Sequence, residues 1–251
     1  MTPPWAYLDY PGPIPFAHRG GASEHPENTM PAFEHAVGLG YRYLETDAHA
    51  TADGVLVAFH DGVLDRVTDR RGVIANLPWE FVRQARIGDT AIPLMEELLT
   101  AWPDVRVNID LKHEASVEPL VAVIERTKTH DRVCVASFSG KRLDRFRRLS
   151  AGKVCTAIGP LDIARLRGAG FGLPAGTFAG GCAQVPVRQG PVLILDRRFV
   201  DAAHRHRLPV HVWTIDDEAE MERLLDLGVD GIMTDRPSVL KEVLVRRGQW
   251  A

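Results

Sequence analysis

The feature that most constrains this chain is a regular alternation of short β-rich runs with helical stretches along nearly its whole length. Such alternation is typical of parallel strands joined by crossover helices. The predicted strands span residues 14–17, 43–48, 105–111, 133–138, 153–157, 182–187, 210–214 and 231–234. The predicted helices span residues 29–39, 94–101, 117–127, 141–149, 197–205, 218–227 and 239–246.

Eight strands in a chain of this length favour an α/β fold closed as a (β/α)8 TIM barrel, with an open doubly wound sheet as the alternative. No linker or shift in composition divides the chain, so we expect one domain over residues 1–251. Residues 61–93 are longer than a normal connection and predict a small insertion or cap. Its apolar side chains predict either a groove or a packed cap: Leu64, Val67, Val73, Ile74, Leu77, Trp79 and Phe81.

Composition excludes several classes of protein. The formal net charge of -3 provides no basic field, so we expect no nucleic-acid partner. No apolar stretch approaches the roughly 18 residues that span a bilayer, and no secretory signal precedes the first strand. The three cysteines form no close pair in the sequence, which favours reduced thiols and a cytoplasmic location. The oligomeric state stays open.

Two carboxylates alternate on the second predicted strand. Glu45 and Asp47 project from the same side of it, because side chains two apart share one face. Two buried like charges repel each other, and a hard divalent cation resolves the conflict with oxygen ligands. A pair of acids on a solvated edge strand is the alternative.

A turn after this strand predicts a hairpin that extends the barrel. Asp53-Gly54 is typical of a two-residue type I′ turn, which pairs Ala52 with Val55. Continued along both strands, this register sets His60 opposite Asp47. An exposed hairpin with an incidental histidine is the alternative.

Other polar residues follow predicted strands, where barrel enzymes carry their active sites. His18-Arg19-Gly20 comes directly after the first strand, and Asp110 and Lys112 share one face of the third. Asp110 is either a further metal ligand or half of an internal ion pair with Lys112. Asn28 or Thr29 can cap the first helix. Asp235, before Arg236-Pro237, is interpreted as a helix cap, with a place on the lining of the cleft as the alternative.

These motifs, in their order and spacing, resemble the glycerophosphodiester phosphodiesterase family. The specific group is H-R-G at 18–20, P-E-N-T at 26–29, E-x-D at 45–47, T-x-D-G-x-x-V at 51–57 and H-D at 60–61. Later segments agree with the family's pattern, at residues 107–112, 137–138, 212–214 and 231–237. The resemblance covers about residues 16–237.

The resemblance implies a (β/α)8 barrel that hydrolyses glycerophosphodiesters to glycerol 3-phosphate and an alcohol. It implies that a divalent cation, Mg²⁺ or Ca²⁺, is held by Glu45, Asp47 and Asp110. The family usually has glutamate where this chain has Asp110, which leaves the preferred metal open.

The resemblance also implies roles for the remaining polar residues at the barrel mouth. His18 and His60 would be the acid and base, and Arg19 and Lys112 would bind phosphate. Independently of the resemblance, Trp213 at the end of the seventh strand either packs against the glycerol moiety or fills the top of the barrel, and a position at the mouth is expected.

Three other functions remain as alternatives. The same chemistry on lysophospholipids, a lysophospholipase D activity, requires an apolar groove near the mouth. A non-catalytic barrel that binds a phosphorylated ligand needs no histidine pair. An isomerase or aldolase of phosphorylated sugars fits the fold but leaves the acid cluster unexplained.

Overall fold

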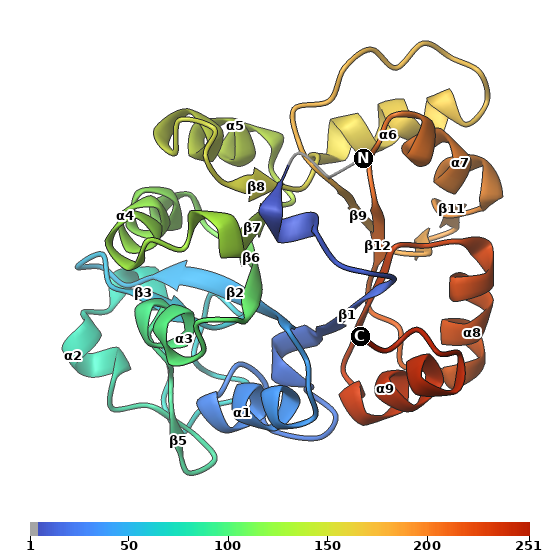
Figure 1. The fold of residues 1–251 in the computed structure, drawn as a ribbon. Helices are drawn as coiled ribbons and strands as arrows, with labels where there is room; N and C mark the ends of the chain where they lie inside the picture. Colours follow the sequence, from blue (N-terminus) through green and yellow to red (C-terminus); the bar gives the residue numbers. More distant parts are fainter. Residues whose placement is uncertain (1–4) are drawn as a thin grey trace.

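A computed structural model of the chain, which describes residues 5–251, contains a closed barrel of parallel strands (Figure 1). The strands, in order around the barrel, are β1 (Ile14–Ala17), β2 (Tyr43–Ala50), β6 (Arg106–Leu111), β7 (Val133–Ala136), β8 (Cys155–Thr156), β9 (Ala183–Val185), β12 (Val210–Val212) and β13 (Gly231–Thr234). β13 pairs with β1, and a parallel bridge from Ala157 to Cys182 joins β8 to β9. The barrel prediction is therefore confirmed over the open sheet.

A helix follows each barrel strand and packs on the outside of the barrel (Figure 1). These helices are α1 (Met30–Gly38), α3 (Met95–Ala101), α4 (Val117–Thr127), α5 (Gly140–Leu149), α6 (Pro160–Ala169), α7 (Arg197–Arg205), α8 (Glu218–Leu227) and α9 (Pro237–Arg246). All but α6 were predicted from the sequence within a few residues. α6 lacks a clear apolar stripe, since only Leu166 and Ala169 in it are fully buried.

The barrel interior is filled at the amino ends of its strands. The short turn η1 (Ala6–Leu8) lies across that end, and Tyr7 packs edge to face on Tyr43 with ring centroids 5.4 Å apart. The Tyr43 hydroxyl donates to the Tyr7 carbonyl over 2.7 Å. The three cysteines also lie in this interior cluster, as free buried thiols. The opposite end of the barrel is therefore the open one.

The predicted hairpin extends β2, but its register differs by one residue from the prediction. β3 (Leu56–Ala58) pairs antiparallel with β2, with Ala48 opposite Ala58, so the loop has three residues instead of two. Asp53 in the loop accepts hydrogen bonds from the Thr51 hydroxyl and from the backbone N–H of Trp79. The hydrogen bond from Trp79, in the following segment, thus favours the three-residue loop. The Asp53-Gly54 dipeptide alone does not specify this loop length.

Residues 61–93 form a small packed cap around η3 (Ile74–Asn76), α2 (Trp79–Val82), β4 (Arg86–Ile87) and β5 (Thr90–Ala91). Leu64 and Ile74 are fully buried there, with Phe59 of the hairpin, in a separate apolar cluster. None of its residues lines the cleft at the barrel mouth. The apolar side chains of this segment thus pack on one another and not along the cleft.

A second, smaller hairpin interrupts the path from β9 to α7. It consists of β10 (Arg188–Gln189) and β11 (Val192–Leu193).

The turns η2 (His18–Gly20), η4 (Glu114–Ser116) and η5 (His130–Arg132) complete the described elements. Over residues 5–251, no helix has the length and apolar character needed to cross a bilayer.

Candidate active site

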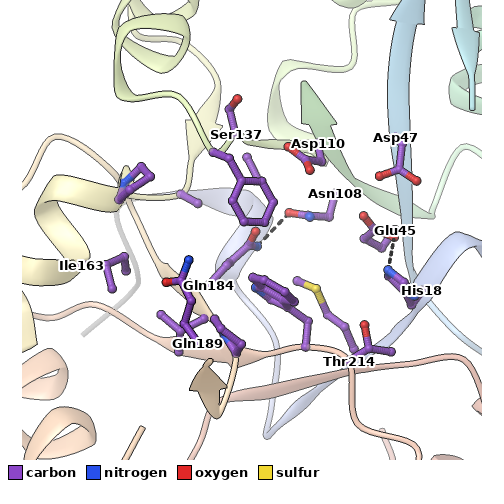
Figure 2. A pocket seen from close by; sticks show the side chains of 18 of the residues that line it. His18, Glu45, Asp47, Asn108, Asp110, Ser137, Ile163, Gln184, Gln189 and Thr214 are labelled. Atoms are coloured by element: carbon purple, nitrogen blue, oxygen red, sulfur yellow. Dashed lines mark hydrogen bonds and ion pairs between the residues drawn. The ribbon is translucent and has the colours of Figure 1, made fainter. Parts of the chain in front are cut away.

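The candidate active site is a cleft of about 660 Å³ at the carboxyl ends of the barrel strands (Figure 2). Its volume falls within the range of small-molecule sites, roughly 300–1,000 Å³. The site residues predicted from the sequence all line it: His18, Arg19, Glu45, Asp47, His60, Asp110, Lys112 and Trp213. The fold thus brings side chains that lie between the end of β1 and the end of β12 in the sequence into one cleft.

The acidic residues come from two neighbouring strands. Glu45 and Asp47 alternate on β2, and Asp110 on β6 is the register partner of Asp47. All three carboxylates are buried, with exposed fractions of 4%, 1% and 6%. Burial raises the pKa of Glu45 to about 7 and also raises the pKa of Asp110. Concentrating acids in this way costs free energy that bound positive charge offsets.

Two cations offset part of this negative charge. Lys112 Nζ lies 2.9 Å from Asp47 Oδ1 and 2.6 Å from Asp110 Oδ2, and Arg19 Nε lies 3.4 Å from Asp47 Oδ2. Burial opposes ionisation of Asp47, but Lys112 and Arg19 outweigh it and lower the Asp47 pKa. The Asp110–Lys112 ion pair therefore exists, but at the cleft instead of deep in the core. Both cations line the cleft.

The backbone of Arg19 adopts an uncommon conformation that serves the site. Its φ of 51° lies in the left-handed region, which costs an L-residue about 1–2 kcal/mol. In this conformation its N–H donates to Glu45 Oε2 over 3.1 Å, and its carbonyl accepts from the N–H of Asn28. The next residue is Gly20, where an added Cβ would lie 2.8 Å from the Cβ of Ala32 in α1. The turn after β1 therefore requires glycine at that position.

His18 is oriented by a carboxylate from the other end of the chain. Its Nδ1 lies 2.6 Å from Asp235 Oδ1, and its Nε2 lies 3.7 Å from Glu45 Oε2. Burial alone would lower the His18 pKa, but these two carboxylates outweigh burial and raise it. The interpretation of Asp235 as a helix cap was wrong, because α9 is capped at Arg236 without any side-chain hydrogen bond.

His60 is oriented by its neighbour in the chain. Its Nδ1 lies 2.6 Å from Asp61 Oδ1, so Nε2 takes no part in this contact. Arg66, from the cap, donates to Asp61 Oδ2 over 2.6 Å and to both carboxylate oxygens of Glu27. Hydrogen bonds from Arg66 lower the pKa of Asp61 to about 2. Glu27 in turn accepts from Arg19 Nη1 over 3.2 Å, so Arg66 links the supports of His60 and Arg19.

Asn28 and Thr29, the two candidate caps of α1, have different roles. Thr29 is the N-cap of α1, since its hydroxyl accepts from the N–H of Ala32. Asn28 is buried and donates through Nδ2 to Asp47 Oδ2 over 3.0 Å, while its Oδ1 accepts from the Thr46 hydroxyl. Asn28 is therefore a support of the acidic cluster, which the sequence did not reveal.

Two aromatic side chains, Phe138 and Trp213, also line the cleft. The rings of Trp213 and Phe138 meet edge to face with centroids 5.6 Å apart, and Phe138 is 63% exposed. Lys112 Nζ lies 5.8 Å from the centroid of the Phe138 ring. Trp213 thus occupies the mouth position predicted for it.

The acidic residues fit a divalent cation in their chemistry but do not form a finished metal centre. Among residues 5–251, no three histidine, cysteine, aspartate or glutamate side chains are arranged to hold an ion. Lys112 instead bridges Asp47 and Asp110. Asp110 Oδ1 is nevertheless buried without a hydrogen-bond partner, and carboxylate oxygens are the ligands that Mg²⁺ and Ca²⁺ prefer. The donors therefore fit a hard cation.

Comparison with known families decides the family of this chain. The sequence matches the "Glycerophosphoryl diester phosphodiesterase family" over residues 18–163 and 174–239. The chain belongs to this family. The matched ranges contain all the predicted site residues, so the resemblance inferred from the motifs is confirmed.

Relatives of the glycerophosphodiester phosphodiesterase family align over almost the whole chain. "Probable glycerophosphodiester phosphodiesterase 2" of Mycobacterium tuberculosis is 42% identical and covers 99% of this chain and 97% of its own. "Lysophospholipase D GDPD1" of Rattus norvegicus is 27% identical and covers 91% of this chain and 85% of its own.

Solved structures agree on the glycerophosphodiester phosphodiesterase fold. A putative family member from Silicibacter pomeroyi superimposes with a TM-score of 0.83 at 22% identity, covering 98% of this chain and 100% of its own. A phosphodiesterase from Oleispira antarctica, in complex with the product sn-glycerol-3-phosphate, has a TM-score of 0.79 at 23% identity, covering 93% and 97%. These similarities support the barrel described above.

Proposed function

We propose that this chain hydrolyses glycerophosphodiesters to glycerol 3-phosphate and an alcohol with the help of a divalent cation. The observation that carries the proposal is the meeting of two carboxylate-oriented histidines, a buried acidic cluster and two cations in one cleft. Membership of the family and the name of the 42% identical mycobacterial relative support it. So does the glycerol 3-phosphate bound to the Oleispira neighbour.

In this proposal the cluster holds the phosphodiester by its charge. Glu45, Asp47 and Asp110 would hold Mg²⁺ or Ca²⁺, which when bound would neutralise charge on the non-bridging phosphate oxygens. Arg19 and Lys112 bind the same oxygens from the protein side. Because this charge grows as phosphorus is attacked, these contacts stabilise the transition state more than the bound substrate.

The two histidines carry the protons. The glycerol hydroxyl next to the phosphate attacks phosphorus, one histidine takes its proton, and the other protonates the departing alcohol. Water then attacks the cyclic phosphate with the roles exchanged: its proton goes to one histidine, the ring P–O bond breaks, and the freed glycerol oxygen is protonated. Asp235 and Asp61 each lie within hydrogen-bonding distance of Nδ1, which directs Nε2 of each ring toward the reaction.

An altered substrate tests the internal attack. We expect an analogue of glycerophosphocholine whose neighbouring hydroxyl is replaced by hydrogen to react at least about 100-fold more slowly, because an intramolecular nucleophile is lost. Single-turnover rates with both substrates would measure this. Turnover of the analogue at an undiminished rate would eliminate internal attack in favour of direct attack by water.

Product release tests the function itself. With glycerophosphocholine and Mg²⁺ or Ca²⁺, we expect glycerol 3-phosphate in an enzyme-coupled assay, and we expect a chelator to abolish its release and added metal to restore it. Binding of the substrate without any product would instead identify a non-catalytic phosphate-binding barrel.

Arg66 is expected to act as a positioning residue, because it holds the carboxylates that support His60 and Arg19. Replacing Arg66 with glutamine should lower kcat/KM by roughly 10–100-fold, as loss of supporting contacts around a site typically does. A shift in the pH profile of kcat should accompany the loss, because Asp61, which contacts His60, then loses the hydrogen bonds that Arg66 donates. Arg83, an exposed cap residue paired only with Glu80, is the control, and Arg83→Gln should leave both unchanged.

The location proposed for this enzyme is the cytoplasm. Cys134, Cys155 and Cys182 are free and buried in the barrel interior. Thiols that stay reduced are typical of a reducing compartment.

A further inference from the structure

Two amide side chains from strands that are not neighbours in the barrel are paired inside the cleft. Gln184 on β9 donates through Nε2 to Asn108 Oδ1 on β6 over 2.8 Å (Figure 2). Asn108 is only 2% exposed, and both residues line the cleft. The proton transfers and the cation site proposed above use neither of them.

The pairing leaves one donor and one acceptor open. Gln184 Nε2 also lies 3.4 Å from His211 Nδ1, so this nitrogen has two partners. Within residues 5–251, Gln184 Oε1 and Asn108 Nδ2 make no side-chain hydrogen bond, and neither atom is enclosed by protein. Both are therefore open to the cleft that their residues line. Polar groups at such depth ordinarily have a hydrogen-bond partner, which points to a polar group of a ligand.

A hydroxyl group matches this arrangement, because it accepts one hydrogen bond and donates another. Its oxygen accepts from Asn108 Nδ2, and its hydrogen is donated to Gln184 Oε1. An ammonium group has no acceptor, a carbonyl group has no donor, and a methyl group has neither. The amide pair therefore distinguishes a hydroxyl from the other groups that a phosphodiester carries.

The amide pair lies next to the proposed cation site and deeper in the barrel. Asn108 is the register partner of Glu45 and stands two residues before Asp110 on the same face of β6. Two residues along a strand span about 7 Å, so Asn108 lies below Asp110 by about that distance. In glycerol 3-phosphate the terminal hydroxyl is two carbons beyond the carbon that carries phosphate. A phosphate held beside the cation thus directs this hydroxyl toward the floor of the cleft.

We propose that Asn108 and Gln184 bind the terminal hydroxyl of the glycerol moiety and make a free hydroxyl at that position a condition for efficient hydrolysis. This proposal rests on the proposed function and adds a specificity that the histidines and the cation do not supply. Holding the far end of glycerol also orients the neighbouring hydroxyl toward phosphorus.

Two substrates tested on the unaltered protein measure this specificity. One is glycerophosphocholine, and the other is its analogue with the terminal hydroxyl replaced by hydrogen and the neighbouring hydroxyl kept. Since choline has no further hydroxyl, the leaving alcohol does not contribute to the comparison. We expect kcat/KM to be about 10–100-fold lower for the analogue, because buried amide groups then lose a hydrogen-bond partner. Equal kcat/KM for the two substrates would overturn the proposal.

Two substitutions assign the specificity to the amide pair. Gln184→Met and Asn108→Ala, tested separately, should each reduce the ratio of kcat/KM between the two substrates to less than about threefold. A merely structural link across the barrel would change stability and leave this ratio as it is. Gln84→Met is the matched control, because Gln84 is exposed in the cap and does not line the cleft, and its ratio should be unchanged. Melting temperatures identify any variant that fails to fold, and the other variant then decides.

The outcomes separate this proposal from the proposed function. A ratio that persists in a folded Gln184→Met or Asn108→Ala variant would overturn the assignment to the amide pair. So would a loss in Gln184→Met that is confined to glycerophosphoinositol, since the pair would then hold a hydroxyl of the leaving alcohol. An absence of hydrolysis with every substrate would refute the proposed function itself.

Discussion

Replacing His60 with alanine is expected to lower kcat/KM for glycerophosphocholine by about 10²–10⁴-fold, the usual effect of removing a general acid or base. His60 lines the cleft with the acidic cluster, and Asp61 fixes its ring from the Nδ1 side. Steady-state kinetics at neutral pH measure the loss. His60→Gln keeps a hydrogen-bonding side chain but cannot transfer protons, so it should be impaired to a similar extent.

The control for this prediction is His206→Ala, because His206 is exposed at the end of α7, which leads to the opposite end of the barrel. That variant should retain full activity. Near-normal turnover by His60→Ala would show that His60 is not one of the two histidines that transfer protons in the proposed mechanism.

Replacing Asp47 with asparagine is expected to have a comparable effect through the proposed cation site and the side chains of Lys112 and Arg19. Asp47 is 1% exposed and contacts Lys112, Arg19 and Asn28. Asparagine keeps the shape but removes the charge that these contacts require. We expect cation affinity and kcat/KM each to fall by more than about 100-fold, beyond the loss typical of supporting residues.

Calorimetric titration with Mg²⁺ and Ca²⁺, alongside kinetics, measures both quantities. Asp144→Asn is the control, because Asp144 is exposed on α5 and pairs only with Arg147. Its affinity and activity should be unchanged. An Asp47→Asn variant that binds the cation as tightly as the unaltered protein would show that other residues hold the ion.

The fold was largely predictable because the information for it is local. β1 and β13 have the bounds predicted for them, residues 14–17 and 231–234. α6 was missed because only Leu166 and Ala169 in it are fully buried, so its pattern resembles a surface segment. The three-residue loop of the β2–β3 hairpin was missed because the cap, not the turn residues alone, selects it.

The site was predictable where neighbours in sequence are neighbours in space. Alternation along β2 predicted that Glu45 and Asp47 act together. The Asp235 contact with His18 spans 217 positions and depends on closure of the barrel. Ala17 is paired with Thr234, so the residues that follow these two strands necessarily meet. The expected pairing of first and last strands is the signal that would have found Asp235.

Arg66 and Asn28 carried no such signal. Arg66 lies in the cap, and its role depends on where the cap folds back against Glu27 and Asp61. Asn28 occupies a position where a helix cap is the ordinary explanation. In both cases the function arises from a tertiary contact that no periodicity encodes.

The most direct measurement is a crystal structure of the protein with glycerol 3-phosphate and Mg²⁺ or Ca²⁺. We predict the ion on the carboxylates of Glu45, Asp47 and Asp110, and the phosphate beside it within reach of Arg19, Lys112 and the imidazoles of His18 and His60. An ion or a phosphate bound away from these side chains would contradict the account.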